Sequence, residues 1–338
     1  MINLISDTVT KPTHGMLKAM MAAEVGDDVF QQDPTVIALE EKVAEIFGKE
    51  AALYCPSGTM SNQLAIRSHL GALDEIICEY NSHIYQYETG AYAMITGAVM
   101  NLVHGENGLL TPNAVEAAIK PEYDWLPNSK LLVVENTCNR AGGTYYTIEQ
   151  MKGLARVAKE NELIYHLDGA RIFNALTESG DNPKEVGSLF DSISMCLSKG
   201  LGAPVGSVLS GSASFIKKAR KFRKALGGGM RQAGYLAAAG IYALDNHIGR
   251  LKEDHNHARI LAETLRAHPW VESIAPGSTN ILIFSLKPPK DSDWFVKTFE
   301  ENGILCSSID GHRVRLVTHL DVSIEMIEQV CSVIKSMD

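Results

Sequence analysis

The chain has 338 residues, of which 45% are hydrophobic and 21% charged, so it can bury a large core and is long enough for two domains. Its net charge of -9 at pH 7 argues against a nucleic-acid-binding surface. No stretch approaches the roughly 20 apolar residues of a membrane span, and the amino terminus lacks a basic region followed by an apolar run. We therefore expect a cytoplasmic protein that binds neither nucleic acid nor membranes.

Cysteine and histidine spacing argues against disulfides and metal sites. The six cysteines lie far apart without any Cys-x-x-Cys pair, which favours free thiols in a reducing compartment. His255 and His257 stand two apart in a segment with helical leucine spacing, so they would point in different directions. We expect them on a solvated helix face, and the sequence predicts no metal site.

Helix and strand patterns alternate along the first two thirds of the chain. Asp33-Pro34 supplies a cap and a first-turn proline for a helix that ends at Gly48, and Thr111-Pro112 opens another helix in the same way. A capping box at 147–150 opens a third helix. Apolar runs typical of buried strands lie at 76–78, 131–134, 163–167, 193–197 and 205–209. This alternation predicts βαβ units and a mainly parallel sheet.

The C-terminal part has a different pattern. A long helical pattern runs from about Met230 to Leu265, and strand-like segments at 280–285, 304–305 and 314–318 then alternate with two helices. We therefore predict an α/β large domain with an N-terminal arm at residues 1–246, and a small α+β domain at residues 247–338.

Two charged residues at predicted strand ends are the most informative feature. Asp168 ends the apolar run 163–167, and Lys199 follows the run 193–197. Either residue alone is typical of a solvated or paired side chain. Together, a carboxylate and an amine at one edge of a parallel sheet are what pyridoxal phosphate (PLP) requires, the first to keep the pyridine nitrogen protonated and the second to bind the aldehyde.

A phosphate site is expected near the turn that contains Gly58 and Thr59. This turn follows the strand-like run 51–54 and opens a helical pattern, so free N–H groups and the positive helix end would favour a phosphate. The alternative is an ordinary turn and cap. Gly227-Gly-Gly-Met-Arg231 is a second possible anion site, with a flexible hinge as its alternative.

These segments together resemble the low-specificity L-threonine aldolases, which are PLP enzymes of the aspartate-aminotransferase fold, over essentially the whole chain. The motifs that carry the resemblance are Ser6-Asp-Thr-Val-Thr10-Lys-Pro12, Val25-Gly-Asp-Asp28, Gly48-Lys-Glu-Ala-Ala52, Pro56-Ser-Gly-Thr59, Glu135-Asn-Thr137, Asp168-Gly-Ala-Arg-Ile-Phe-Asn174, Leu197-Ser-Lys-Gly200, Gly227-Gly-Gly-Met-Arg-Gln232 and Arg315-Leu-Val-Thr-His319. The resemblance implies a PLP-dependent transferase-like large domain of fold type I, and pyridoxal 5'-phosphate as the cofactor.

The resemblance also implies roles in cofactor binding. Lys199 is similar to the Schiff-base lysine, Asp168 to the partner of the pyridine nitrogen, and Arg171 to the neighbour of the ring hydroxyl. The turn Gly58-Thr59 would bind the phosphate. His83 resembles the histidine that stacks on the ring and reaches the β-hydroxyl of the substrate.

Further residues are implied in substrate binding and assembly. Ser6 and Arg315 resemble ligands of the substrate carboxylate, for which a planar guanidinium is well suited. Arg313 lies on the same strand face and is the competing candidate. Lys224 and Arg231 are similar to basic residues that the family lends across a subunit interface, so at least a homodimer, and by resemblance a homotetramer, is implied.

Two residues depart from the family pattern. Trp125 stands where many members carry a second active-site histidine, and Cys138 stands where a histidine is frequent. An indole cannot act as a base near neutral pH, which leaves His83, water or the cofactor phosphate to accept the β-hydroxyl proton. We expect Trp125 to line the pocket and to alter the preference among threonine, allo-threonine and aryl-serine substrates.

The implied activity is that of an aldehyde-lyase. The resemblance implies retro-aldol cleavage of L-threonine, L-allo-threonine and related β-hydroxy-α-amino acids to glycine and an aldehyde. The same cofactor also supports an amino-acid racemase or a β-eliminating lyase, because the reaction type depends on which bond stands perpendicular to its ring. A non-catalytic binding protein of the same fold is the remaining alternative, and the intact set of cofactor-binding residues counts against it.

Overall fold

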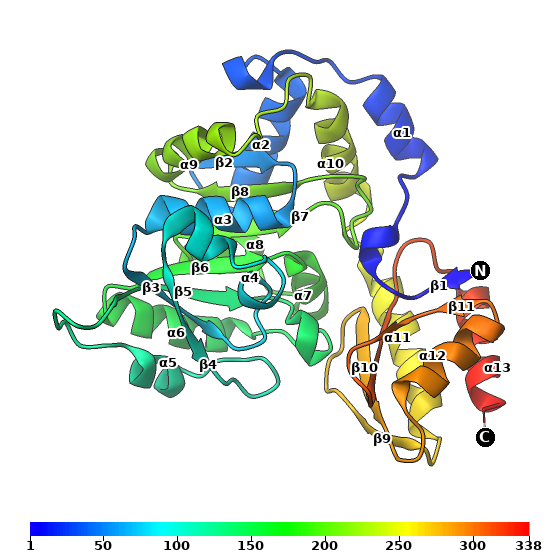
Figure 1. Cartoon of the computed structure of the whole chain (residues 1–338). Coiled ribbons are helices and arrows are strands. Elements are labelled where there is room, and N and C mark those ends of the chain that lie inside the picture. The colour runs from blue at the N-terminus through cyan, green and yellow to red at the C-terminus, as the bar shows by residue number, and fades with distance from the viewer. Residues whose placement is uncertain (338) are drawn as a thin grey trace.

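A computed structural model describes residues 1–337, in which a seven-stranded sheet forms the centre of the larger part of the molecule (Figure 1). The strand order is β2-β8-β7-β6-β5-β3-β4. The strands are β2 (Ala51–Cys55), β3 (Asp74–Glu79), β4 (Val99–Val103), β5 (Asn128–Glu135), β6 (Ile164–Gly169), β7 (Ser192–Cys196) and β8 (Ser207–Gly211). Only β8 runs antiparallel to its neighbours, so the predicted mainly parallel sheet is confirmed.

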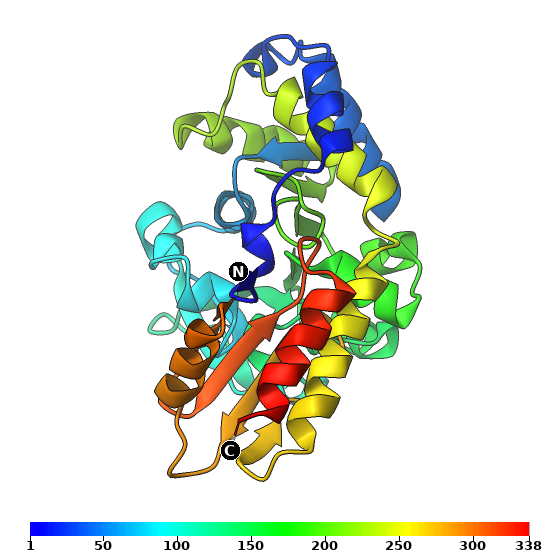
Figure 2. The ribbon, with the colours of Figure 1, turned by 90° about the vertical axis from the view of Figure 1, so that its right-hand side faces the viewer.

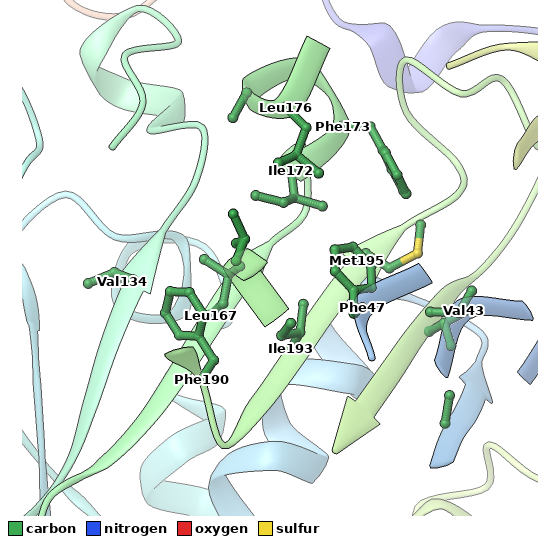
Figure 3. Close-up of a cluster of buried hydrophobic side chains, with 14 of the residues drawn as sticks. Val43, Phe47, Val134, Leu167, Ile172, Phe173, Leu176, Phe190, Ile193 and Met195 are labelled. Atoms are coloured by element: carbon green, nitrogen blue, oxygen red, sulfur yellow. The ribbon is translucent and has the colours of Figure 1, made fainter. Parts of the chain in front are cut away.

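The central strands are buried on both faces, which explains their continuous apolar runs. In β5, Leu132 and Val134 contribute to one hydrophobic cluster, and Leu131 and Val133 contribute to another on the opposite face. Figure 3 shows part of the first cluster, in which side chains of α2 and α7 pack against the sheet. Strand β4 lacks a continuous apolar run because its residues are exposed or half-buried, and for this reason the sequence did not predict it.

The helix boundaries follow the capping signals in the sequence. Helix α2 (Pro34–Phe47) begins after Asp33, whose carboxylate accepts the first free N–H groups, and it ends at Gly48 in the left-handed conformation. Helices α5 (Pro112–Ala118) and α6 (Ile148–Glu160) begin as predicted, the latter with the complete capping box. The other helices before residue 230 are α1 (His14–Met21), α3 (Gly58–His69), α4 (His83–Gln86), α7 (Ile172–Ser179), α8 (Pro183–Leu189) and α9 (Ala213–Ala225), with short turns η1 (Asp7–Val9), η2 (Asp28–Phe30), η3 (Tyr92–Thr96) and η4 (Asn139–Ala141).

The prediction of one long helix from Met230 to Leu265 is wrong. The structure has two helices there, α10 (Gly234–Asn246) and α11 (Leu251–Arg266). At the break, the His247 side chain bonds the carbonyl of Leu201 at 2.7 Å, and this tertiary contact has no signature in the helical spacing.

The solvated position predicted for the histidines of α11 is also wrong. His255 is 1% exposed, with Nδ1 2.9 Å from Glu178 and Nε2 3.0 Å from Asn174, and His257 is buried as well. Both Glu178 and Asn174 belong to α7. The packing of α11 against α7 therefore buries a polar helix face that the sequence pattern of α11 alone predicts to be exposed to solvent.

The C-terminal part forms a separate antiparallel sheet of order β12-β13-β10-β9, with α11 and α13 lying side by side (Figure 2). Its elements are β9 (Val271–Ile274), β10 (Ile281–Leu286), α12 (Ser292–Glu301), β11 (Ile304–Leu305), β12 (Ser307–Ser308), β13 (Arg313–Val317) and α13 (Ile324–Lys335). The N-terminal strand β1 (Ile2–Asn3) pairs in parallel with β11, so the arm starts in the C-terminal part. The domain limits at 246 and 247 stay a prediction. Among the helices of residues 1–337, none combines the length and the apolar character needed to span a bilayer.

Candidate active site

A pocket of about 330 Å³ lies where loops at the carboxyl ends of the parallel strands meet the C-terminal sheet. Residues of three separate segments line it, namely the N-terminal arm, the large sheet with its loops, and the C-terminal sheet. They are Ser6, Thr8, His83, Tyr87, Asn139, Arg140, Arg171, Lys199, Ile283, Ser307, Ser308, Ile309 and Arg315. The fold thus brings together Ser6, His83, Arg171, Lys199 and Arg315, all singled out in the sequence.

Lys199 and Asp168 come from neighbouring strands. Asp168 lies at the end of β6 and pairs in register with Ser194 of β7, and Lys199 follows the end of β7. The Asp168 side chain is buried and accepts hydrogen bonds from Asn62 Nδ2 at 2.9 Å and from the Ala170 N–H at 3.2 Å. Both donors are neutral, so neither balances the charge of the carboxylate. Asp168 can therefore accept a further hydrogen bond from a cationic group.

His83 is fixed by two buried acids. Its backbone N–H donates to Glu135 Oε2 at 2.8 Å, and its Nδ1 donates to Glu88 Oε1 at 3.0 Å. Glu88 also accepts from Asn62 at 3.0 Å, and because Asn62 bonds Asp168 as well, one network joins His83 to Asp168. Burial of the imidazole opposes its protonation, but the hydrogen bond to Glu88 and the charges of Asp168 and Glu88 raise the pKa of His83.

Arg171 forms a buried two-point ion pair with Asp7. Its Nε and Nη2 donate to the two carboxylate oxygens of Asp7, each at 2.7 Å, and Asn280 donates to the same carboxylate at 3.2 Å. Although burial opposes ionisation, the charge and hydrogen bonds of Arg171 hold the pKa of Asp7 well below its usual range. The pair therefore ties the N-terminal arm, the large sheet and, through Asn280, the C-terminal part to the floor of the pocket.

Arg315 lies on β13 with unused hydrogen-bonding capacity. Its Nη2 donates to Asn139 Oδ1 at 2.9 Å and its Nη1 to the carbonyl of Ile5 at 3.2 Å, whereas its buried Nε has no partner within residues 1–337. Burial, with the like charge of Arg171, lowers the pKa of Arg315 to about 10. The competing candidate, Arg313, instead pairs with Asp310 at 2.7 Å and does not line the pocket.

The N-terminus of α3 has free donors that could bind an anion. Ser57 caps the helix by accepting from the Met60 N–H, and the N–H groups of Gly58 and Thr59 have no acceptor in the described part of the chain. A Cβ atom on Gly58 would lie 2.7 Å from Cys196 Sγ, so only glycine fits at this turn.

Comparisons with known proteins agree with this geometry. Residues 3–287 match the beta-eliminating lyase family. The chain is 43% identical over 338 residues to the probable low-specificity L-threonine aldolase 2 of Arabidopsis thaliana, covering 98% of this chain and 95% of the relative. It is also 43% identical over 342 residues to the low specificity L-threonine aldolase of Escherichia coli (strain K12), covering 98% of each. The chain belongs to the low-specificity L-threonine aldolase family.

Solved structures show that this family member has the expected fold. The threonine aldolase of Leishmania major superposes with a TM-score of 0.86 at 22% identity, covering 99% of each chain. A putative L-allo-threonine aldolase from Listeria monocytogenes EGD-E gives a TM-score of 0.82 at 20% identity, over 99% of this chain and 95% of that one. The predicted fold class, a fold type I α/β domain with a small α+β domain, is confirmed.

Besides Asp168, Gly58 and Thr59, described above, three further residues that the family resemblance singled out do not line the pocket of the single chain. Lys224 is in the last turn of α9, and Arg231 is 54% exposed and pairs with Asp27 at 2.8 Å. Trp125 is 76% exposed and stacks on Tyr123 with ring centroids 4.8 Å apart. None of the three lines the pocket within residues 1–337, so their assigned roles stay predictions.

Several residues in or next to the pocket were not predicted from the sequence. Asp7 stands inside a quoted motif but was given no role, and Glu88, Tyr87 and Arg140 lie in segments without a recognised pattern. Cys138, which departs from the family, is buried, and its thiol donates to the carbonyl of Glu135 at 3.1 Å. Burial raises the pKa of Cys138 well above its usual range, so its thiol is protonated and structural.

The contact between His83 and Glu88 predicts the effect of Glu88→Gln. The glutamine keeps the size of the side chain but removes the negative charge, so the pKa of His83 should fall. If neutral His83 is the base, the acid limb of the pH profile of kcat/KM should move to lower pH. The imidazole titration can be followed by NMR, with Glu106→Gln on an exposed turn as the matched control. An unchanged His83 titration in Glu88→Gln would contradict the proposed role of Glu88.

Proposed function

We propose that this protein is a PLP-dependent aldehyde-lyase that cleaves L-threonine, L-allo-threonine and related β-hydroxy-α-amino acids to glycine and an aldehyde. The observation that carries the proposal is the convergence of Lys199, His83 and Arg315 on one pocket. The names of the relatives, low-specificity L-threonine aldolases at 43% identity, support the same activity.

The residues present fit the cofactor. Lys199 would bind its aldehyde, Asp168 its pyridine nitrogen, and Arg171 would lie beside the ring hydroxyl. The turn at 58–59, where only glycine fits at residue 58, would hold the phosphate, and His83 would stack on the ring. When bound, PLP withdraws electrons from the α-carbon of the amino acid, which weakens the bonds to that carbon.

The protein's own residues would supply orientation and proton transfer. Arg315, whose buried Nε is free, and Ser6 would hold the α-carboxylate so that the Cα–Cβ bond stands perpendicular to the cofactor ring. His83 would take the proton of the β-hydroxyl, the Cα–Cβ bond would break, and the aldehyde would leave. Protonation at Cα then gives glycine. The acid network of Glu88 and Asp168 holds His83 in place for this step.

The test is a visible spectrum of the purified protein, followed by addition of L-threonine with coupled detection of acetaldehyde. A band near roughly 410 to 430 nm, expected of PLP bound to a lysine, with acetaldehyde released in proportion to glycine, would support the proposal. The band with D-allo-threonine as product, from inversion at Cα alone, would instead favour a racemase, and the band with an oxo acid as product would favour a β-eliminating lyase. No band after addition of PLP would contradict the whole assignment.

Arg315→Gln should raise KM for L-threonine, because the α-carboxylate loses its charged donor. A hydrogen bond to a charged group contributes about 1.5–3 kcal/mol, so we expect a rise of about 10- to 100-fold. Arg313→Gln, on the same strand but paired with Asp310, is the matched control and should leave KM unchanged. Equal effects of the two changes in steady-state kinetics would count against Arg315 as the carboxylate ligand.

The proposed assembly is a cytoplasmic homotetramer, or at least a homodimer, in which Lys224 and Arg231 reach the active site of a neighbouring subunit. Both residues are exposed and neither lines the pocket of its own chain, which is compatible with such a role. Analytical ultracentrifugation would test the subunit count, and a monomeric active enzyme would exclude the shared site.

A further inference from the structure

The pocket around Lys199 is lined by basic side chains, and within residues 1–337 none of its lining residues is acidic. Most of these basic side chains already pair with an acid or have a proposed role in binding. Arg171 is neutralised by Asp7, Arg315 is assigned to the α-carboxylate, and Lys199 is assigned to the cofactor. Arg140 is left without an anion to pair with.

Arg140 is held in the pocket by a neutral partner. It lies in η4, is half-buried, and its Nη1 donates to the Tyr87 hydroxyl at 3.1 Å. The guanidinium carbon lies 5.8 Å from the centroid of the Tyr87 ring. In the described part of the chain, Arg140 forms no ion pair with an aspartate or glutamate. A guanidinium has five N–H donors, so most of its hydrogen-bonding capacity remains for a ligand.

The position of Arg140 corresponds to the β-substituent of the substrate. Tyr87 contacts both residues, because its ring centroid lies 5.6 Å from that of His83 and its hydroxyl accepts from Arg140 at 3.1 Å. Since His83 is assigned to the β-hydroxyl, we place the β-substituent on the side of His83 where Tyr87 and Arg140 lie. The neighbouring Asn139 accepts a hydrogen bond from Arg315 at 2.9 Å. Arg315, assigned to the α-carboxylate, thus bonds the residue next to Arg140, and both arginines line the same pocket.

We propose that Arg140 makes this pocket select β-hydroxy-α-amino acids whose β-substituent carries an anionic group, with a carboxylate as the test case. The proposal rests on the aldolase function above, and it names the substrate class of the same site. A guanidinium binds a carboxylate through two parallel charge-assisted hydrogen bonds, which a methyl group or an amide cannot replace.

The chemistry is that of the proposed reaction. With β-hydroxyaspartate, the hydroxyl proton passes to His83, the Cα–Cβ bond breaks, and Cβ becomes the carbonyl carbon of glyoxylate. The α-carbon gains a proton and leaves as glycine, so no oxidant, reductant or further reactant is consumed.

The test compares kcat/KM for β-hydroxyaspartate and for its neutral isostere β-hydroxyasparagine, with holoenzyme of the wild type, Arg140→Gln and Arg140→Lys. We expect the wild type to prefer the carboxylate by about 10-fold or more, the factor that about 1.4 kcal/mol represents. Arg140→Gln should lose this preference, and Arg140→Lys should keep part of it. Arg156→Gln, an exposed arginine on α6, should keep all of it.

A binding measurement separates recognition from chemistry. L-Aspartate and L-asparagine lack the β-hydroxyl and cannot undergo the cleavage, so calorimetric titration of the holoenzyme reports their affinities alone. The wild type should bind L-aspartate more tightly, and Arg140→Gln should remove the difference. Equal affinities in the wild type, or a carboxylate preference that survives in Arg140→Gln, would overturn the proposal. A wild type that fails to cleave L-threonine, β-hydroxyaspartate and β-hydroxyasparagine would instead overturn the proposed function.

Discussion

Replacement of Lys199 by alanine is expected to lower kcat for threonine cleavage by about 10⁴-fold or more. Losses of this size follow in other enzymes when a residue that acts covalently is removed. Alanine has no nucleophile with which to hold the cofactor aldehyde. The change can be measured as acetaldehyde release from purified variant saturated with PLP. The visible band of lysine-bound cofactor should be lost at the same time, even if PLP still binds at the phosphate site.

The fold should survive this change, which makes the result interpretable. The contact of Lys199 with the N-terminal arm, from Thr10 Oγ1 at 3.3 Å, uses its backbone carbonyl and remains in the alanine variant. Lys159→Ala, an exposed lysine on α6, is the matched control and should leave kcat unchanged. Circular dichroism would establish that the Lys199→Ala variant is folded. If the folded variant then turned over threonine at the wild-type rate, the lysine would have no part in the mechanism.

The positions of Lys199 and Asp168 were predictable because they depend on local sequence. An apolar run that ends in a charged residue defines a strand and its exit, and adjacent parallel strands place their carboxyl ends at one edge. The β6–β7 register, with Asp168 opposite Ser194, follows this rule. The boundaries of α2 were predictable for a similar reason, because Asp33 and Gly48 act within one turn of the helix that they limit.

The partners of these residues were not predictable, because they come from distant segments. Asp7 and Arg171 are 164 positions apart, and only the folded N-terminal arm brings them together. Glu88 follows a short helix with no periodic pattern, yet its side chain is fully buried by bonds to Asn62 and His83. Burial of a charged side chain requires such partners, and single-sequence patterns carry no information about them.

Tertiary packing also overrode the local signal in the C-terminal half. The apolar spacing from Met230 to Leu265 continues across the turn between α10 and α11, so the break at His247 was not visible. The partner of His247 at this break, the carbonyl of Leu201, lies outside the segment itself.

Asp168→Asn should lower kcat/KM by roughly 10²- to 10³-fold, the typical loss when one preorganised electrostatic partner of the reacting centre is removed. Asn62 donates to Oδ2 and the Ala170 N–H to Oδ1, so the single oxygen of the amide can keep one of these two hydrogen bonds. The two side chains have nearly the same size, so the packing should be retained. A neutral amide, however, cannot stabilise a protonated pyridine nitrogen, and the electron withdrawal on which the Cα–Cβ cleavage depends is weakened.

The measurement should separate chemistry from cofactor binding. The variant should still show the visible band of lysine-bound PLP, because Lys199 is intact, while acetaldehyde release falls. Asp124→Asn, on an exposed loop, is the control for the same chemical change. Near-normal kcat/KM in Asp168→Asn would show that the pyridine nitrogen does not need this carboxylate. Loss of the band would show that Asp168 acts in holding the cofactor, since a residue that only tunes the cofactor's electronics leaves the lysine linkage in place.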